Sequence, residues 1–154
     1  MSSCELVIAP AKDARAVALN FSDDRWSCLQ IDYYELALHE LVAKLRKRSR
    51  KVIFKEIKDL TPKLPGADKA EPWDERFWVA SVGQLSAAYV KALAGIQDSD
   101  LPEVANWLFA TDQLRHERKF TSNITKKSVA RDLRNIRDFL ASAGKRTVLI
   151  RGST

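Results

Sequence analysis

A run of cations in the middle of the chain is the part of the sequence best suited to chemistry. Residues 44–58, KLRKRSRKVIFKEIK, carry eight lysines and arginines against a single acid, Glu56. Phosphates are natural partners for such a run, because each cation that contacts a nucleic-acid phosphate releases condensed counterions. If residues 31–60 form one long helix, with successive residues about 100° apart, a stripe of cations collects on one side of it. The stripe consists of Lys44, Lys47, Arg48, Lys51, Lys55 and Lys58, and it is flanked on its far side by Arg46 and Arg50.

A second group of cations lies nearer the C-terminus. A helix is predicted from about residue 125 to residue 144, because apolar residues recur there at helical spacing: Val129, Leu133, Ile136 and Leu140. Its cations fall on the opposite side, and arginine suits close contact because its planar guanidinium can hold a phosphate through two hydrogen bonds. Side by side, the two groups would form one track for a phosphate backbone. The predicted contacts in this second group are Arg115, Arg118 and Lys119 before the helix, and Lys126, Lys127, Arg131, Arg134 and Arg137 on it.

In most of the segments that must position these cations, apolar residues recur at helical spacing. Helices are expected over residues 31–60, 73–94 and 125–144, with a further one capped by Asp100 and carrying Pro102 in its first turn. Residues 61–72, rich in proline, predict a surface loop or hinge. The β-rich runs ELVIAP and RTVLIRG near the two ends could pair as strands. We therefore expect a mainly α fold, a single domain over residues 1–154 built as a bundle of four to five helices, with room for a small β pairing of the termini.

Part of the first helix has an alternative interpretation. Val52, Ile53 and Phe54 are adjacent and favour β structure. The helix could then end near Arg48 and be followed by a short strand over residues 51–57. Phe54 and Phe120 stand near cations, but they form no base-stacking motif and are interpreted as packing residues.

Charge is divided unevenly along the chain. Residues 1–40 hold three basic and seven acidic residues, a net charge of −4, whereas residues 41–154 hold 23 basic and 13 acidic residues, a net charge of +10. The basic part is expected to meet DNA or RNA. The acidic N-terminal region, with Trp26 as a candidate contact, is expected to meet a protein partner or a second copy of the chain.

The sequence carries few signs of catalysis. His39 and His116 each follow a carboxylate by four residues, Glu35 and Asp112, which indicates helical ion pairs rather than a metal site. No glycine-rich phosphate loop occurs, and the adjacent Asp23 and Asp24 lack a second acidic cluster. We expect no enzymatic activity, no cofactor and no metal.

Cysteine content and hydropathy indicate the cellular setting. The only cysteines, Cys4 and Cys28, are expected to be reduced and buried. A cytoplasmic protein without membrane contact is expected, because no secretory signal or long apolar run is present.

Residues 124–152, ITKKSVARDLRNIRDFLASAGKRTVLIRG, resemble the recognition helix and wing of winged helix-turn-helix regulators. The resemblance covers about a fifth of the chain, and the polar RHERKFTSN upstream departs from the compact first helix of that family. It implies a DNA-binding regulator in which Lys127, Ser128 and Arg131 meet the major groove. In size and charge the chain is also similar to the small helical subunits of CRISPR effector complexes, a resemblance that rests on no motif.

Three functions are therefore open. The first is a non-enzymatic protein that binds nucleic acid through phosphates, as a subunit of a nucleoprotein complex. The second is a winged-helix-like regulator. The third is a protein-binding adaptor or immunity-type module with a basic interface.

Overall fold

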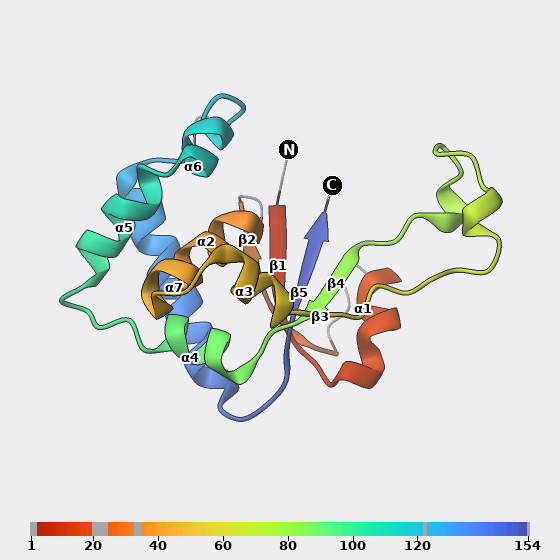
Figure 1. Ribbon diagram of the computed structural model, residues 1–154, viewed down its shortest axis with the longest axis horizontal. Helices are drawn as coiled ribbons and strands as arrows, with labels where there is room; N and C mark the ends of the chain where they lie inside the picture. The colour runs from red at the N-terminus through yellow and green to blue at the C-terminus, as the bar shows by residue number, and fades with distance from the viewer. Residues whose placement is uncertain (1–2, 20–24, 33–34, 122, 154) are drawn as a thin grey trace.

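A five-stranded antiparallel sheet organises the molecule. The computed structural model describes residues 3–19, 25–32, 35–121 and 123–153. The strands follow the order β2-β1-β5-β4-β3 across the sheet (Figure 1). Their bounds are β1 Ser3–Ile8, β2 Ser27–Ile31, β3 Lys58–Asp59, β4 Ser81–Gln84 and β5 Val148–Ser153.

The two ends of the chain form the middle of this sheet. β1 and β5 pair from Ser3 with Ser153 to Ile8 with Val148, so the pairing expected for the two terminal runs is present. It is central rather than accessory, because each of these strands has a second neighbour. Both strands are apolar in consecutive positions, and Val7 and Leu149 are buried on the opposite face from Leu6 and Ile150. Such runs suit strands covered on both sides.

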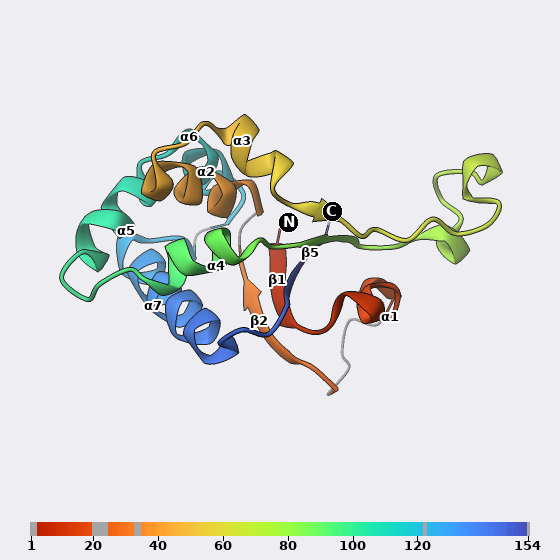
Figure 2. The ribbon, with the colours of Figure 1, turned by 60° about the horizontal axis from the view of Figure 1, so that its bottom comes forward.

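Helices cover both faces of the sheet unequally. The larger core lies under α2 to α7, and on the other face the short α1 packs on Val7, Val82 and Leu149 (Figures 1 and 2). The bounds are α1 Ala14–Leu19, α2 Glu35–Arg46, α3 Arg50–Lys55, α4 Ala87–Ala94, α5 Leu101–Phe109, α6 Asp112–Glu117 and α7 Lys126–Ala143, with 3-10 turns η1 Ala11–Asp13, η2 Ala67–Lys69 and η3 Glu75–Phe77.

A buried charge pair joins the layer of α1 to the sheet. The Arg151 side chain is 4% exposed and forms an ion pair with Glu5, which lies directly across the β1–β5 ladder. Its Nη1 also donates a hydrogen bond of 2.7 Å to the carbonyl of Val17 in α1. The pair thereby connects β1, β5 and α1.

The expected mainly α bundle is wrong, because the chain forms a mixed α/β fold around the sheet. The helix expected over residues 73–94 accounts for part of the error. Only α4 of that span is an α-helix, and it begins after Ser86, whose hydroxyl accepts a hydrogen bond of 3.1 Å from Tyr89 N–H. Val82 belongs to β4, and the Trp78 side chain is 59% exposed. The period that linked Trp78 to Val82 is therefore coincidental.

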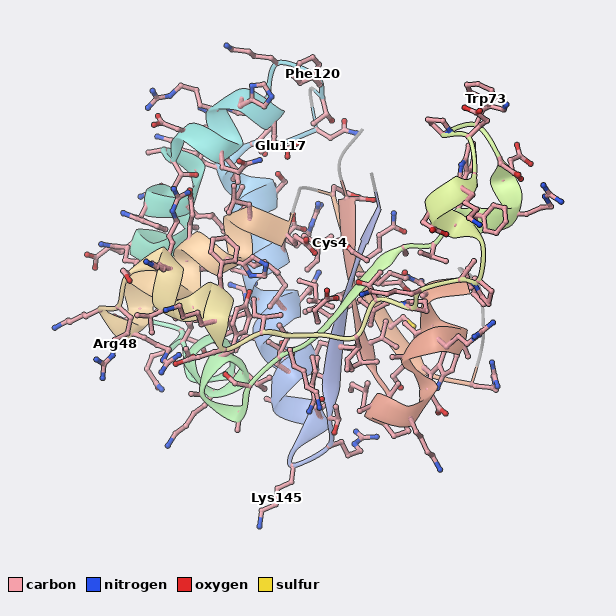
Figure 3. All side chains as sticks on the ribbon, turned by 45° about the vertical axis from the view of Figure 1, so that its right-hand side comes forward. Cys4, Arg48, Trp73, Glu117, Phe120 and Lys145 are labelled. Carbon is pink, nitrogen blue, oxygen red and sulfur yellow. The ribbon has the colours of Figure 1, made fainter. Side chains whose placement is uncertain are left out.

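The connection from β3 to β4 spans residues 60–80 and extends away from the rest of the molecule (Figures 1 and 2). It includes residues 61–72, the expected loop or hinge, together with η2 and η3. Trp73, near its tip, is 72% exposed (Figure 3). Within the described residues this connection contributes little to the two cores.

The C-terminal helix agrees closely with its apolar period. Val129, Leu133, Ile136 and Leu140 are all buried in α7. Thr125 caps the helix, with its hydroxyl accepting a hydrogen bond of 3.0 Å from Ser128 N–H, and Ser128 Oγ accepts one from Thr125 N–H. The prediction of this helix is confirmed.

Candidate nucleic-acid interface

The basic run 44–58 turns a corner instead of forming one helix. α2 ends at Arg46, and Lys47 adopts a left-handed conformation with φ of 53°. Hydrogen bonds from Arg48 N–H to the Ala43 carbonyl and from Lys47 N–H to the Lys44 carbonyl close a Schellman-type end. Ser49 then caps α3 by accepting a hydrogen bond of 3.3 Å from Val52 N–H. The expected continuous helix over residues 31–60 is wrong, and so is the alternative strand over 51–57, because α3 occupies most of it.

Two arginines of this run form ion pairs with acidic residues. Arg46 pairs with Glu56, and Arg50 pairs with Glu40 at 2.6 Å. Each pair joins α2 to α3 or to the residue that follows it, so both pairs hold the corner closed. These are the two arginines that the helical projection placed beside the stripe.

The predicted stripe residues have no such partners. All six are exposed, and none forms an ion pair in the part of the chain that the structure describes. Only Lys44 has a specific contact, with its ammonium 5.0 Å from the ring centre of Trp107 in α5. Arg48 lies at the outer edge of the helical layer (Figure 3). We call Lys44, Lys47, Arg48, Lys51, Lys55 and Lys58 the corner cations.

The second predicted group is more engaged with the protein itself. Arg118 donates a hydrogen bond to the Phe109 carbonyl and lies 3.8 Å from the centre of that ring, over which Lys126 also lies at 5.9 Å. Arg137 is only 16% exposed and pairs with Asp98 at 2.5 Å and Asp138 at 3.0 Å. Exposed members are Arg115 and Arg131, which pair with Asp112 at 3.3 Å and Asp132 at 3.6 Å, and Lys119, Lys126, Lys127 and Arg134.

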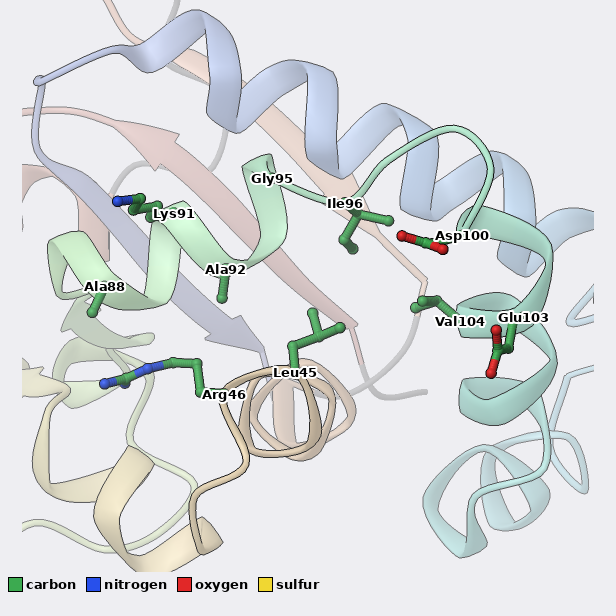
Figure 4. Close-up of a pocket in the computed structure, with 10 residues that line it drawn as sticks. All are labelled: Leu45, Arg46, Ala88, Lys91, Ala92, Gly95, Ile96, Asp100, Glu103 and Val104. Carbon is green, nitrogen blue, oxygen red and sulfur yellow. The ribbon is translucent and has the colours of Figure 1, made fainter.

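The corner cations and the cations of α7 do not lie side by side, although α6 lies next to α2 (Figure 2). Figure 2 places α3 and α7 at opposite edges of the helical layer, with α2 and α4 between them. A cavity of about 530 Å³ between α2, α4 and the start of α5 is lined by Arg46 and Lys91 but also by Asp100 and Glu103 (Figure 4). The cavity between α2 and α4 therefore carries charges of both signs, and the corner cations and α7 do not form one uninterrupted basic surface across it (Figure 2).

The wing that the winged-helix resemblance implied is replaced by β5. This strand is central in the sheet, and Val148, Leu149 and Ile150 are buried. Ser128, one of the residues that would meet DNA, has its hydroxyl committed to the cap of α7. The likeness to that family is therefore limited to the helix.

The histidines do not form the expected helical ion pairs. His39 is buried, its Nδ1 lies 2.8 Å from the Tyr89 hydroxyl, and burial lowers its pKa to about 4, so it is neutral at pH 7. The ring of His116 contacts Phe120 edge-on, with 5.2 Å between the centres. Phe54 and Phe120 are 44% and 71% exposed, although each ring also packs edge-on against a histidine, His39 and His116.

A pocket beside the corner cations was not predicted. It has a volume of about 310 Å³, and its lining includes Glu35 and His39 of α2, Phe54 of α3 and Ser81 of β4. The sequence signal for it was weak, because Glu35 and His39 have the spacing of an ordinary helical pair. Only the packing of α2 and α3 against the sheet brings these side chains together.

Other groups that could do chemistry are dispersed. Burial raises the pKa of the Cys4 thiol, which stays protonated, and Cys28 is exposed, contrary to expectation. No cluster of three or more potential metal ligands occurs within the described residues. In the acidic N-terminal region, Asp23 and Asp24 lie outside the described residues, Glu5 is paired with Arg151, and the half-buried Trp26 donates a hydrogen bond of 3.4 Å to Asp13.

Comparisons with known proteins find no family model, no curated protein and no solved structure that matches this chain. In the described part of the molecule, none of the helices has both the length and the apolar character required to cross a bilayer.

Proposed function

We propose that this protein binds nucleic acid mainly through the phosphate backbone, that the corner cations supply the main contacts, and that it acts within a nucleoprotein complex. The observation that carries the proposal is the contrast within a single run of sequence. Arg46 and Arg50 are neutralised by acids, whereas the six corner cations remain exposed without an ion pair in the described structure. Six like charges within fifteen residues, from the end of α2 through α3 to β3, repel one another, and an anionic partner would relieve that repulsion.

The chemistry of the corner suits a backbone rather than a base sequence. Five of its six cations are lysines, which act as compact point charges and do not impose the planar geometry of a guanidinium. They do not form one helical face that could fill a major groove, because only Lys44 lies in α2 and α3 has six residues. We therefore expect binding to DNA or RNA with little sequence preference from the corner itself.

The test replaces four corner cations, Lys47, Arg48, Lys51 and Lys55, with glutamine in one variant. Glutamine has a helix propensity close to that of lysine, so the fold should survive. On duplex DNA, the slope of log affinity against log salt should become shallower by about 0.9 for each phosphate contact removed. Fluorescence anisotropy over a salt series measures the affinity and the slope of log affinity against log salt.

A matched control removes the same charge from the other side of the molecule. Lys12 and Arg15 lie near α1, and Lys63 and Lys69 lie on the 60–80 connection, and all four are exposed. Their joint replacement with glutamine lowers the net charge from +6 to +2, as the corner variant does. The control should keep the wild-type slope. Equal losses in the two variants would assign binding to net charge alone, and binding of an acidic protein but no nucleic acid at low salt would refute the proposal.

A further inference from the structure

The pocket beside the corner is built around a carboxylate without a partner. Glu35, the first residue of α2, is half-buried and makes no hydrogen bond or ion pair within the described structure. Burial raises the pKa of its carboxyl above the ordinary value for glutamate. A half-buried carboxylate that lacks donors is unfavourable, so its presence at a cavity indicates that donors arrive from outside.

The sheet beneath Glu35 is shaped to leave room for this carboxylate. A Cβ atom at Gly152 of β5 would lie 3.0 Å from Glu35 Oε2 and 2.6 Å from Ser81 Oγ. Any larger residue at position 152 would therefore displace both polar groups. The absence of a side chain at Gly152 lets a carboxylate and a hydroxyl stand together over the central strand, on the wall of the pocket.

Two aromatic rings form another wall. His39 is held by Tyr89, and its ring meets Phe54 edge-on with 5.3 Å between the centres. The contact with His39 holds the Phe54 ring on one side, and 44% of Phe54 remains exposed. An exposed aromatic ring beside a cavity can hold the flat face of an unpaired base.

Two residues of the basic run line the pocket. Phe54 and Ile57 line the pocket, and the corner cations Lys55 and Lys58 follow each of them directly in the chain. A phosphate held by these lysines would be attached to a nucleoside within reach of the pocket. The volume of about 310 Å³ lies at the lower end of the range for small-molecule sites, about 300–1,000 Å³.

We propose that this pocket receives an unstacked guanine base of a single-stranded nucleic acid, with its Watson–Crick edge directed at Glu35 and its face against Phe54. A carboxylate only accepts hydrogen bonds, and it can accept two side by side. Guanine is the base that presents two adjacent donors on that edge, N1–H and the N2 amino group, whereas the other bases mix donors and acceptors there. A partner arginine offers a similar pair of donors, and Asp59 in the lining would also attract it, but the exposed Lys55 and Lys58, next in the chain to two lining residues, favour a polyanion. The inference depends on the proposed function, because the corner cations deliver the strand.

The experiment compares short single-stranded oligonucleotides with the full chain at low salt. An oligo-uridine carrying one central guanosine should bind about ten- to a hundredfold more tightly than oligo-uridine itself, the range for one well-made bidentate contact. Replacing that guanosine with inosine, which lacks the N2 amino group, should remove most of the gain. In the Glu35→Gln variant the amide presents one donor and one acceptor, so the guanosine and inosine strands should bind alike.

Two further measurements keep the outcome decisive. Thermal unfolding checks that Glu35→Gln is folded. A second variant, Phe54→Leu, removes the aromatic ring and keeps the carboxylate. It should weaken the binding of guanosine strands while preserving the ratio of guanosine-strand to inosine-strand affinity. Guanosine monophosphate alone should compete, weakly, and more strongly than N-acetyl-arginine amide. Wild-type binding that is equal for all the strands would overturn the guanine site and leave the phosphate proposal standing, whereas no binding to any strand would overturn both. Stronger competition by the arginine compound would overturn the guanine site in favour of a protein ligand.

Discussion

His39 should make the protein less stable as the pH falls from 7 to 4. Burial lowers the pKa of its imidazole to about 4, whereas an unfolded chain has a histidine pKa of about 6.5. Between these values the unfolded state binds a proton that the folded state does not. The stability that neutral His39 contributes is therefore complete above about pH 6.5 and is lost as the pH falls towards 4. A difference of about 2.5 pKa units corresponds to about 3.4 kcal/mol in the free energy of unfolding.

The control is the variant His39→Asn, which does not titrate but keeps a polar atom near the position of Nδ1 for the Tyr89 hydroxyl. Glu35, whose pKa is raised by burial, acts in the opposite direction in both proteins, so the comparison removes its effect. Urea unfolding followed by circular dichroism at pH 7 and pH 4 measures the change. Wild type should lose about 3 kcal/mol more than the variant, and parallel losses in the two proteins would refute the assignment of a buried, neutral His39.

Two predictions concern stability elsewhere. Lys47→Gly should raise the free energy of unfolding by about 1 kcal/mol, because Lys47 has a φ of 53° where glycine is favoured; thermal unfolding measures this, and Lys47→Ala should give no gain. Glu5→Gln should cost about 3 kcal/mol in denaturant unfolding, because it removes the negative charge that pairs with the buried Arg151 across the β1–β5 ladder. The double variant Glu5→Leu with Arg151→Met should recover part of that loss, and an unchanged stability of Glu5→Gln would contradict the role of the pair.

The parts of the fold that followed from sequence are those decided by neighbours in the chain. α7 was predicted because its apolar residues recur every three or four positions and its ends carry local signals, Thr125 and Gly144. The terminal strands were also evident, since short β-rich apolar runs can be recognised without knowledge of their partners. The runs did not indicate where in the sheet the two strands lie, because a pair of strands can have the same sequence pattern at the centre of a sheet as at its edge.

The errors arose where a helical period continued across a break. The series through Leu41, Leu45 and Val52 fits one helix, but Lys47 and Ser49 end α2 and begin α3. In a similar way, Val82 and Leu85 fit a helix that the structure divides into a strand and α4. Periodicity records which side chains are apolar and not which element buries them, so it cannot exclude two short elements packed on one core.

At the candidate interface, the types and spacing of the cations follow from the sequence, whereas their exposure and their ion pairs follow from the fold. Composition alone located the cations of residues 44–58 and showed a single acid, Glu56, among them, since charge is a property of each residue. Whether a given cation is free depends on residues brought close by folding, as with Arg46 and Glu56 or Arg137 and Asp98. The Glu35 pocket depends wholly on the tertiary structure, because its walls come from α2, α3, β3, β4 and β5, and their distances are set by packing between segments that lie more than a hundred residues apart in the chain.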